Sequence, residues 1–376
     1  MKVLLLATHI NIGGIGVYTF NLAKYLRKKN IEVIVVSGGG ELEDPFREED
    51  IRHIRLDMRT KSEFGIKMWK NIPALIRIIR DEKIELVHAQ TRVTQVMGCI
   101  AEKFTGIPYV STCHGFYKYN RISRRMFPCW GRKIIAISKS VERHLLDDFM
   151  LPEGTVDQIY NGIEVDRFAC ALESKGRELI SKIGVSGKIT VIGSVGRFSP
   201  VKGYKYLIRA FKILIENYPE IRLFLVGDEG PALNNLKTQV DREGLADKVF
   251  FDHATVPDLE NYLGVMDIFC LPSLDEGLGL SMMEAMAAGC ACVGSDVGGI
   301  SELIIDGEDG LLARPADEKH LAERISCLLE DPERAREIAR KAGLKAKEKF
   351  SITESVDKTI KVYEEAVCSG RGRRGA

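Results

Sequence analysis

Residues 266–289 read MDIFCLPSLDEGLGLSMMEAMAAG. An apolar run that predicts a strand leads through a glycine-bearing loop into a helix-forming run, which ends at Gly289. Strand, short loop and helix in this order are the repeating unit of a parallel α/β sheet. Ligands of such sheets bind at the carboxyl ends of the strands, where this loop begins. The stretch therefore predicts both the fold class and the position of the functional site.

The same alternation runs through the chain in two series. Strands are expected at 2–8, 31–39, 84–90, 107–115 and 133–138 in the first series, and at 188–197, 221–230, 248–254, 266–273, 290–296 and 309–315 in the second. Amphipathic helical runs such as 17–30 and 204–218 lie between them. We therefore expect an α/β fold of two doubly wound parallel-sheet domains facing across a cleft, with the join near residues 165–187.

The composition is that of a soluble globular protein with two domains, at 376 residues, 45% hydrophobic and 28% charged. A net charge of +1 argues against nucleic acid as a partner. The charge is uneven, because residues 1–165 carry 25 Lys and Arg against 19 Asp and Glu. The first half could therefore face an acidic partner.

Other features of the chain bear on its location. Nine cysteines without a CxxC pair indicate reduced thiols and a cytoplasmic protein. The opening residues, MKVLLLATHINIGG, predict a first strand rather than a signal peptide. No run approaches the roughly 18 apolar residues that a membrane span needs.

Glu276 and Glu284 have different expected roles. The helix should begin near Leu280, so its first free N–H groups point into the loop and suit a phosphate. Gly277 and Gly279 allow a ligand close to the backbone. Glu276 would read the reacting sugar, while Glu284, about one turn into the helix, would accept from the two hydroxyls of a ribose. The alternative is that Glu276 only complements the helix dipole and that Glu284 lies on a solvated face.

Arg197 and Lys202 follow a strand and flank a turn at Pro200. Two cations on a loop at a strand end can clamp a diphosphate, Arg through its planar fork and Lys as a point charge. The alternative is a pair of solvated loop charges.

Gly13 and Gly14 lie between the first strand and the first helix, and His114 ends a later strand beside Gly115. The glycine turn is not a G-x-G-x-x-G fingerprint, because Thr19 stands at the third glycine position, and this disfavours NAD. Strand ends are where site residues lie, which makes His114 a candidate. The alternatives are a plain tight turn and a buried, hydrogen-bonded histidine.

No metal site and no cofactor are expected. The histidines show no metal-ligand spacing, and nowhere are two Asp separated by one residue. The usual acidic clamp for Mg²⁺ or Mn²⁺ on a nucleotide sugar is therefore missing. Cations of the protein would have to replace the metal.

Residues 118–133, KYNRISRRMFPCWGRK, hold six cations and no acid, with Phe, Trp, Tyr and Met between them. Such a segment could lie on an anionic membrane surface or grip a phosphorylated glycan. The alternative is a solvated helix with buried aromatic side chains.

Together these motifs resemble the family 4 retaining glycosyltransferases, also called glycosyl transferases group 1, of the GT-B fold. The matching segments, in chain order, are GGIGVYTFNLAKYL, HG at 114–115, IYNGIEVDRF, GRFSPVKGYKYLIRAF, LVGDEGP, EGLGLSMMEAMAAG and GGISELIIDGEDGLL. Each is a soft motif by itself. Their order and spacing over nearly the whole chain make the resemblance specific.

The resemblance implies a nucleotide-sugar donor held mainly by the second domain. Arg197 and Lys202 would bind the diphosphate, Glu284 the ribose, and Glu276 the hydroxyls of the donor sugar. Further donor contacts would come from the backbone of Gly277, Leu278, Gly279 and Leu280.

The resemblance also assigns residues of the first domain. Gly13 and Gly14 would close over the donor, and His114 would line the reaction centre. The expected catalytic residues are His114, Glu276, Arg197 and Lys202.

Two Rossmann-like domains follow from the resemblance. The acceptor domain would span 1–168 and the donor domain 169–352, and a final helix at about 353–367 would cross back to the first domain. Residues 368–376 are expected to form a flexible tail.

The implied activity is that of a hexosyltransferase-type glycosyltransferase (EC 2.4). It would move a sugar from a UDP- or GDP-sugar to a glycan or lipid-linked acceptor, retaining the anomeric configuration without a metal ion. Its place would be the synthesis of cell-surface polysaccharide or lipopolysaccharide, in the cytoplasm and peripherally on the inner face of the membrane. The alternatives are a GT-B sugar-nucleotide epimerase, a non-catalytic nucleotide-sugar-binding protein and an NAD oxidoreductase.

Overall fold

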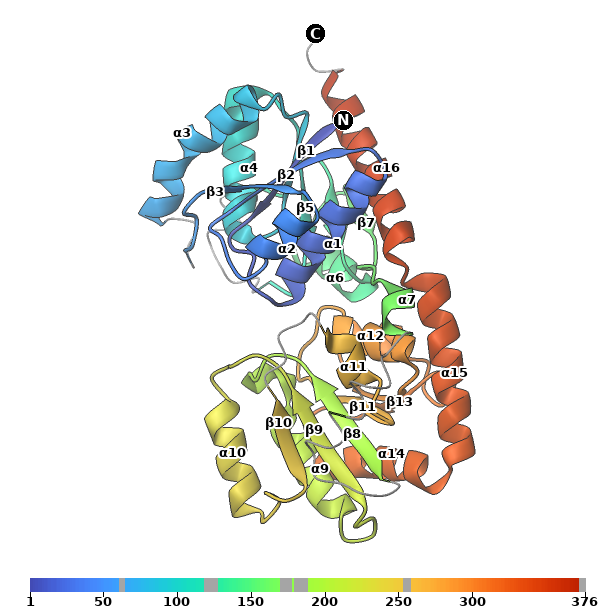
Figure 1. The fold of residues 1–376 in the computed structure, drawn as a ribbon. Helices are drawn as coiled ribbons and strands as arrows, with labels where there is room; N and C mark the ends of the chain where they lie inside the picture. The colour runs from blue at the N-terminus through green and yellow to red at the C-terminus, as the bar shows by residue number, and fades with distance from the viewer. Residues whose placement is uncertain (61–64, 118–127, 170–177, 179–188, 253–257, 372–376) are drawn as a thin grey trace. The chain divides into compact units, whose positions relative to one another are not determined.

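The structure is a computed structural model that describes residues 1–60, 65–117, 128–169, 178, 189–252 and 258–371 (Figure 1). Its contacts divide the chain into two compact units. Unit 1 comprises Met1–Gly162 and Ile352–Ala376, and unit 2 comprises Ile163–Ser351. The chain enters unit 2 earlier than the expected break after residue 168, because α7 (Val165–Phe168) packs on helices of unit 2.

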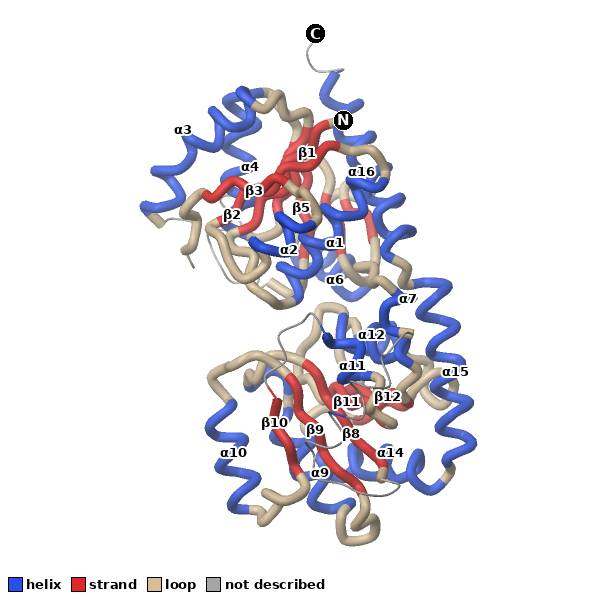
Figure 2. Tube along the Cα trace, viewed as in Figure 1, coloured by secondary structure: helices blue, strands red, loops and turns tan. Residues whose placement is uncertain are grey.

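The described residues of unit 1 form a sheet of seven parallel strands in the order β3-β2-β1-β4-β5-β6-β7. Figure 2 shows strands of this sheet in red, with helices in blue. The strands are β1 (Lys2–Ala7), β2 (Glu32–Ser37), β3 (Arg52–Arg55), β4 (Leu86–Ala89), β5 (Tyr109–Cys113), β6 (Ile134–Ala136) and β7 (Val156–Gln158). The central strand β1 is buried from its second residue onward, as a strand between two helical layers must be. The outer strands β3 and β7 are additions to the expected set. Both are short and partly exposed, so neither carries a long apolar run.

Helices cover both faces of this sheet. They are α1 (Gly14–Lys28), α2 (Glu43–Glu48), α3 (Ile66–Asp81), α4 (Arg92–Thr105), α6 (Lys139–Arg143) and α16 (Ile352–Arg371). α1, α2 and α16 pack on the face that holds Val3 and Leu5, whereas α3 and α4 pack on the face that holds Leu4 and Leu6. The α-helix α6 continues directly as a π-helix, η1 (His144–Asp148).

The C-terminal helix α16 is part of the core of unit 1, where Val356 and Tyr363 are completely buried. It begins at Ile352 and continues to Arg371. The expectation of a flexible tail from residue 368 is therefore wrong for its first residues, and 372–376 lie outside the described residues.

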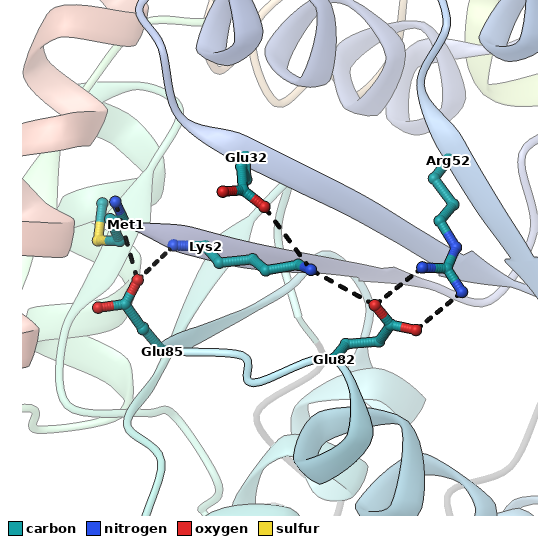
Figure 3. Close-up of polar contacts among 6 residues, drawn as sticks. All are labelled: Met1, Lys2, Glu32, Arg52, Glu82 and Glu85. Atoms are coloured by element: carbon teal, nitrogen blue, oxygen red, sulfur yellow. Dashed lines mark hydrogen bonds and ion pairs between the residues drawn. The ribbon is translucent and has the colours of Figure 1, made fainter.

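A network of charged side chains joins the amino ends of the strands in unit 1 (Figure 3). Lys2 Nζ lies 3.4 Å from Glu82 Oε2 and 3.6 Å from Glu32 Oε2. Arg52 Nη1 donates to Glu82 Oε2 at 2.8 Å, and the backbone N–H of Lys2 donates to Glu85 at 2.6 Å. The network lies at the end of the sheet opposite to the carboxyl ends of the strands. We therefore assign it a structural role.

Unit 2 repeats this topology with six parallel strands in the order β10-β9-β8-β11-β12-β13. The strands are β8 (Thr190–Val195), β9 (Ile221–Val226), β10 (Val249–Asp252), β11 (Ile268–Leu271), β12 (Ala291–Ser295) and β13 (Leu311–Ala313). Each of the six begins and ends within or near an expected strand. The predicted fold class, two doubly wound parallel-sheet domains, is confirmed.

The helices of unit 2 also cover both faces of its sheet. Besides α7 and the 3₁₀ turn η2 (Pro200–Lys202), they are α9 (Tyr204–Leu214), α10 (Leu233–Arg242), α11 (Leu259–Leu263), α12 (Leu280–Ala288), α13 (Ile300–Leu303), α14 (Glu318–Glu330) and α15 (Pro332–Lys349). α9, α10 and α14 pack on the face that holds Ile268 and Cys270. α12 lies on the other face, where a Cβ atom on Gly294 would be 3.1 Å from Met282 Cε. Among the described helices, none combines the length and hydropathy that crossing a bilayer requires.

Candidate functional site

The loops that leave β8 and β11 lie side by side in unit 2. These strands are neighbours in the sheet, and the chain leaves them toward opposite edges. The backbone N–H of Leu274 donates to the Val201 carbonyl at 2.7 Å. A Cβ atom on Gly203 would lie 1.9 Å from the Pro272 carbonyl oxygen, so only glycine allows this approach. The junction is the topological switch point, where open α/β sheets bind their ligands.

Lys202 and Glu276 meet at this junction. Lys202 Nζ lies 2.6 Å from Glu276 Oε2, and Ser273 Oγ donates to the same oxygen at 3.2 Å. The side chains of Lys202 and Glu276 are only 22% and 18% exposed. The alternative of a solvated loop charge is therefore wrong for Lys202. Arg197, on the same loop, is exposed.

The N-terminus of α12 opens onto the loop that carries Glu276. Gly279 is the N-cap residue, with a φ of 99°, and no side chain of the described residues caps this end. Its first N–H groups are therefore suited to an anion. Leu278 is 2% exposed and anchors the loop in the core, and the Gly299 N–H donates to the Glu276 carbonyl at 2.9 Å. The helix begins at Leu280, as the sequence predicts.

Glu284 is 9% exposed and forms no hydrogen bond with any residue that the structure describes. Burial raises the pKa of its carboxyl group to about 7. The positive charge of Arg167 lowers this pKa and the negative charge of Glu260 raises it. The alternative of a solvated face is wrong for Glu284. Its carboxylate is a buried acceptor that makes no hydrogen bond to the described residues, as a ligand-binding acid would be.

Unit 1 has a switch point of its own, between β1 and β4. Thr8 Oγ1 and Thr91 Oγ1, on the loops after these strands, are 2.6 Å apart. Gln90 follows β4 directly, is 1% exposed, and donates its backbone N–H to the Leu6 carbonyl at 3.0 Å. The carboxyl end of β5, with His114, lies next in the sheet.

His114 is held at this edge of the sheet by two neighbours. Its Nε2 lies 3.0 Å from Gln90 Oε1, and its ring meets the Tyr18 ring edge to face with centroids 4.9 Å apart. With the amide oxygen of Gln90 facing it, Nε2 would carry the proton and Nδ1 would be left as an acceptor. Burial lowers the pKa of His114 to about 3, so the ring is neutral. His114 is thus a partly buried, hydrogen-bonded histidine whose second ring nitrogen makes no hydrogen bond to the described residues.

Gly13 and Gly14 begin α1 at the surface of unit 1. Gly13 is exposed, its φ is 145°, and a Cβ atom there would meet nothing within 4 Å. Tyr18, about one turn into α1, contacts His114. The structure thus brings the start of α1 and the end of β5 together. It brings the predicted residues of unit 2 together separately, around the switch point and α12.

Several residues of these sites were not expected from the sequence. In unit 2 they are Ser273 beside Glu276, and Arg167 and Glu260 near Glu284. In unit 1 they are Gln90 and Tyr18. Arg167 stands in the motif IYNGIEVDRF, which was the only signal available. Glu260 lies on a short helix, and no strand end or glycine turn marks it.

The basic segment 118–133 is described only from residue 128. Arg132 Nε donates to Glu102 Oε1 at 2.6 Å, and Lys133 Nζ lies 2.7 Å from Glu365 Oε2 and 3.2 Å from Asp157 Oδ2. These two cations are therefore paired within unit 1 rather than free to bind a membrane. The other four cations lie outside the described residues.

Both units match models of known protein families. Residues 12–167 match the model described as Glycosyltransferase Family 4. Residues 177–345 match the model described as Glycosyl transferases group 1. The two matches together take in most of both units.

Several named proteins are similar to this chain over most of their length. The chain is 27% identical over 292 residues to the UDP-Gal:alpha-D-GlcNAc-diphosphoundecaprenol alpha-1,3-galactosyltransferase of Escherichia coli, covering 74% of this chain and 75% of that protein. It is 26% identical to the capsular polysaccharide biosynthesis glycosyltransferase CapM of Staphylococcus aureus, covering 87% and 88%. A crystal structure of Anabaena HepE in complex with UDP and glucose superposes with a TM-score of 0.86 at 22% identity, covering 97% and 100%. This structural similarity covers nearly the whole chain, so both units share the backbone architecture of that structure.

Proposed function

The chain belongs to the family 4 glycosyltransferases, the glycosyl transferases group 1, and is a transferase of class EC 2.4 with the GT-B fold. From this membership we propose that it moves a sugar from a nucleoside diphosphate sugar to a hydroxyl group of a glycan or lipid-linked acceptor. We also propose that the anomeric configuration is retained and that no metal ion takes part.

The observation that carries the proposal is the contact between Lys202 and Glu276 beside the uncapped N-terminus of α12. The contact places a cation, a carboxylate and a helix N-terminus at one switch point. Lys202 and the N–H groups of α12 suit the two phosphates, and the exposed Arg197 on the same loop adds a planar donor. Glu276 is an acceptor for sugar hydroxyls. This is the set of groups that a sugar diphosphate requires.

The proposed reaction replaces one bond at the anomeric carbon by another. The bond between this carbon and the diphosphate oxygen breaks, and its electron pair leaves with the diphosphate. The acceptor oxygen bonds to the carbon, and its proton passes to an oxygen of the leaving phosphate. Positive groups fixed before the reaction stabilise the growing charge on the diphosphate. Lys202, Arg197 and the α12 N-terminus take this role in place of a divalent ion.

Glu284 is proposed to hold the ribose of the donor. A carboxylate that accepts from two adjacent hydroxyls is a common way to bind ribose. Glu284 is buried, unpaired within the described residues, and one turn from the proposed phosphate site. Two ribose hydroxyls would supply the hydrogen bonds that this carboxylate lacks.

His114 is proposed to position a reacting hydroxyl group rather than to act as a strong base. Its Nδ1 would accept the hydrogen bond of that hydroxyl group, since Nε2 lies 3.0 Å from Gln90 Oε1. The lowered pKa of its ring, about 3, makes it a weak proton acceptor. The proton of the acceptor is therefore assigned to the leaving phosphate.

The acceptor class is proposed from the relatives. Their names describe transfer to a diphosphoundecaprenol-linked sugar and synthesis of capsular polysaccharide. We propose an acceptor of the same kind, in the synthesis of cell-surface polysaccharide or lipopolysaccharide.

Peripheral association with an anionic membrane is proposed for unit 1, through one face of α3. Ile66 and Trp69 on this face are 72% and 51% exposed, and Lys70 lies beside them. Phe104 of α4, 64% exposed, lies at the other end, where Arg80 Nη2 donates to its carbonyl at 3.2 Å. Exposed aromatic and aliphatic side chains with Lys and Arg are typical of interfacial anchors.

A vesicle experiment tests this association. We expect the protein to sediment with vesicles that contain anionic phospholipid more than with neutral ones. The double variant Trp69→Ala, Lys70→Glu should bind at least about fivefold less, since the loss of one Lys near an anionic surface alone costs about 1 kcal/mol and the variant also loses an aromatic anchor. Ile305→Ala, which changes an exposed apolar residue of unit 2, is the control and should bind normally. Equal binding by the double variant and the wild type would contradict the role of this face.

A thermal-shift screen of nucleotides and sugar nucleotides, with and without EDTA, tests the donor class. UDP- or GDP-sugars should raise the midpoint of unfolding, and EDTA should leave the shift unchanged. A strict metal requirement would contradict the proposed role of the protein cations. The best donor, incubated with candidate acceptors, then separates the alternatives. An epimerase converts the sugar nucleotide without an acceptor, and a binding protein leaves it intact.

A further inference from the structure

Three neighbouring helices of unit 2 carry charged side chains that influence one another, and Glu284 is one of them. α7, α11 and α12 pack on one another, and they carry Arg167, Glu260 and Glu284. Arg167 donates to Glu260 Oε2 from Nη2 at 2.8 Å and from Nε at 3.0 Å. The Arg167 and Glu260 side chains are 33% and 18% exposed. The guanidinium is therefore fixed in place beside the helix that carries Glu284.

This arrangement leaves Glu284 without a hydrogen bond from the described residues but within the field of a fixed cation. A carboxylate buried in this way is costly unless a positive charge offsets the loss of water. The ionised carboxylate offers both oxygens as acceptors to the two hydroxyls of a ribose, whereas the protonated acid uses one of its oxygens as a donor. Arg167 and Glu260 therefore influence whether Glu284, the proposed ribose ligand, is ionised.

We propose that Arg167, held by Glu260, is a positioning residue for the donor nucleoside: it keeps Glu284 in the ionised form that accepts hydrogen bonds from the ribose. The inference rests on the proposed function, because it takes Glu284 as the ribose ligand. It adds that donor affinity depends on pH and that α7, from the segment IYNGIEVDRF, controls this dependence.

Other charged groups near α12 do not share this role. The elements that pack on α12 are α7, α11, α13, α15, β11 and β12. Arg167 and Glu260 are the charges that shift the pKa of Glu284, after its burial. The other titratable groups on these elements are not among the named causes of the shift: Asp166, Tyr262, Glu302, Cys270, Cys292 and the charged residues of α15.

The expected pH dependence has a definite sign. The pKa of Glu284 is about 7, so the carboxylate is protonated below pH 7 and ionised above it. Donor affinity should rise with pH through about 7 and level off above. Removing the positive charge of Arg167 should raise the pH at the midpoint of this rise in affinity, and removing the negative charge of Glu260 should lower it.

The test measures the affinity of UDP-glucose by calorimetry from pH 5.5 to 8.5, with GDP-glucose as a second probe. The diphosphate of these donors does not titrate in this range, unlike the terminal phosphate of free UDP. Arg167→Gln should weaken binding about tenfold at pH 6 and about twofold or less at pH 8.5, as expected for a midpoint raised by about one pH unit. Glu260→Gln should strengthen binding at pH 6. Glu284→Gln should make donor affinity independent of pH in this range. Arg167→Lys should restore most of the wild-type profile.

The control is Arg209→Gln, which removes a cation paired with Glu318 at 3.5 Å elsewhere in unit 2. It should leave the midpoint unchanged. If Arg167→Gln and Glu260→Gln weaken binding by the same factor at every pH, Arg167 acts only on the structure and the inference is overturned.

A second readout needs no ligand and separates this inference from the proposed function. The pKa of Glu284 is raised from 4.5 to about 7 on folding. The stability of the wild type relative to Glu284→Gln should therefore fall as pH rises from 4.5 to 7 and stay constant above. Arg167→Gln should extend this fall to higher pH. If Arg167→Gln extends the loss of stability to higher pH but no nucleotide sugar binds, Arg167 does act on the ionisation of Glu284 and the assignment of Glu284 to the ribose is wrong. If the loss of stability does not extend to higher pH, Arg167 does not act on Glu284 and the inference is overturned.

Discussion

The contact between Lys202 and Glu276 combines two roles that the sequence assigns separately. A lysine at a diphosphate site and a glutamate at a sugar site each lie near the bond that breaks. Their 2.6 Å contact ties the two functions to one point. A bound diphosphate would compete with Glu276 for Lys202, and the loss of either residue would leave the other charge without its partner.

Lys202→Ala should weaken UDP binding far more than uridine binding. The lost charge-assisted hydrogen bonds to phosphate are each worth about 1.5–3 kcal/mol, or about 10- to 100-fold in affinity. Uridine, which lacks phosphate, should lose little. Calorimetric titration of both ligands measures the difference, and Lys205→Ala, an exposed neighbour on α9, serves as the control. Equal losses for both ligands would show that Lys202 supports the fold rather than the diphosphate.

The buried histidines of unit 1 predict sensitivity to acid. His88 lies between Tyr363 and Thr112, with both hydrogen bonds at 2.7 Å. Burial and the neighbouring His114 lower the pKa of His88 to about 3, against 6.5 in the unfolded chain. Between these values the unfolded state binds more protons, so stability is lost as pH falls below 6.5. His88→Gln should lose less stability between pH 8 and pH 5, as measured by urea unfolding. Parallel losses in the variant and the wild type would contradict this assignment.

At the scale of single elements, loops in unit 2 are positioned by glycines that permit close backbone approach. Gly203 lies where the loops after β8 and β11 meet, with a φ of 69°. Both its conformation and the nearby Pro272 carbonyl exclude a side chain. The spacing between Lys202 and Glu276 therefore depends on this glycine as well as on the two charges.

Gly203→Ala should cost clearly more stability than Gly244→Ala. Gly244 has nearly the same φ, 70°, but a Cβ atom there would meet nothing within 4 Å. Gly244→Ala thus isolates the backbone strain, which is about 1 kcal/mol or more. Gly203→Ala adds a clash with a carbonyl oxygen and should cost a further 1–3 kcal/mol, roughly the range for overpacking. Denaturant unfolding compares the two variants, and equal costs would rule out a constraint from the loop contact.

The sequence predicts the elements of this protein unevenly. Strands buried on both faces, such as β1 and β11, carry continuous apolar runs and are predicted correctly. The outer strands β3 and β7 and the short helix α2 are missed because exposure removes the apolar pattern. The π-helical η1 keeps a helical pattern, so periodicity does not distinguish it from α6.

The site shows a similar limit. Gly279, Leu280 and Glu284 lie within one strand-loop-helix unit, so local spacing predicts their places. The ion pairs of the site join distant parts of the chain: Lys202 pairs with Glu276, 74 positions away, and Arg167 with Glu260, 93 positions away. No local pattern encodes such pairs, and only the packing of the elements brings them together.

At the scale of the whole molecule, unit 1 is built from the two ends of the chain. Tyr363 of α16 is completely buried, and its hydroxyl group bonds to His88 across 275 positions of sequence. The last helix is therefore part of the framework that carries His114, because His88 also bonds to Thr112 on β5, the strand that leads to His114.

Tyr363→Ala should destabilise unit 1 and leave unit 2 largely intact. The loss of a buried aromatic side chain costs about 3–5 kcal/mol. Both tryptophans of the chain, Trp69 and Trp130, belong to unit 1, so their fluorescence reports on that unit alone. The fluorescence transition in denaturant should move to lower concentration and separate from the loss of secondary structure seen by circular dichroism. Tyr363→Phe should cost about 1–3 kcal/mol, since it leaves His88 with an unpaired nitrogen. A single shifted transition in both signals would mean that the units unfold together.

The return of α16 to unit 1 also sets an order of events on the ribosome. Unit 2 is one uninterrupted segment and can fold once it has emerged. Unit 1 cannot complete its core until α16 has been made, and α16 ends about 210 residues, or roughly 10–40 seconds of translation, after Gly162. During that interval the surface that awaits Val356 and Tyr363 is open to water and to other newly made chains. A nascent chain of this protein should therefore be a client of chaperones for as long as unit 1 waits for helix α16.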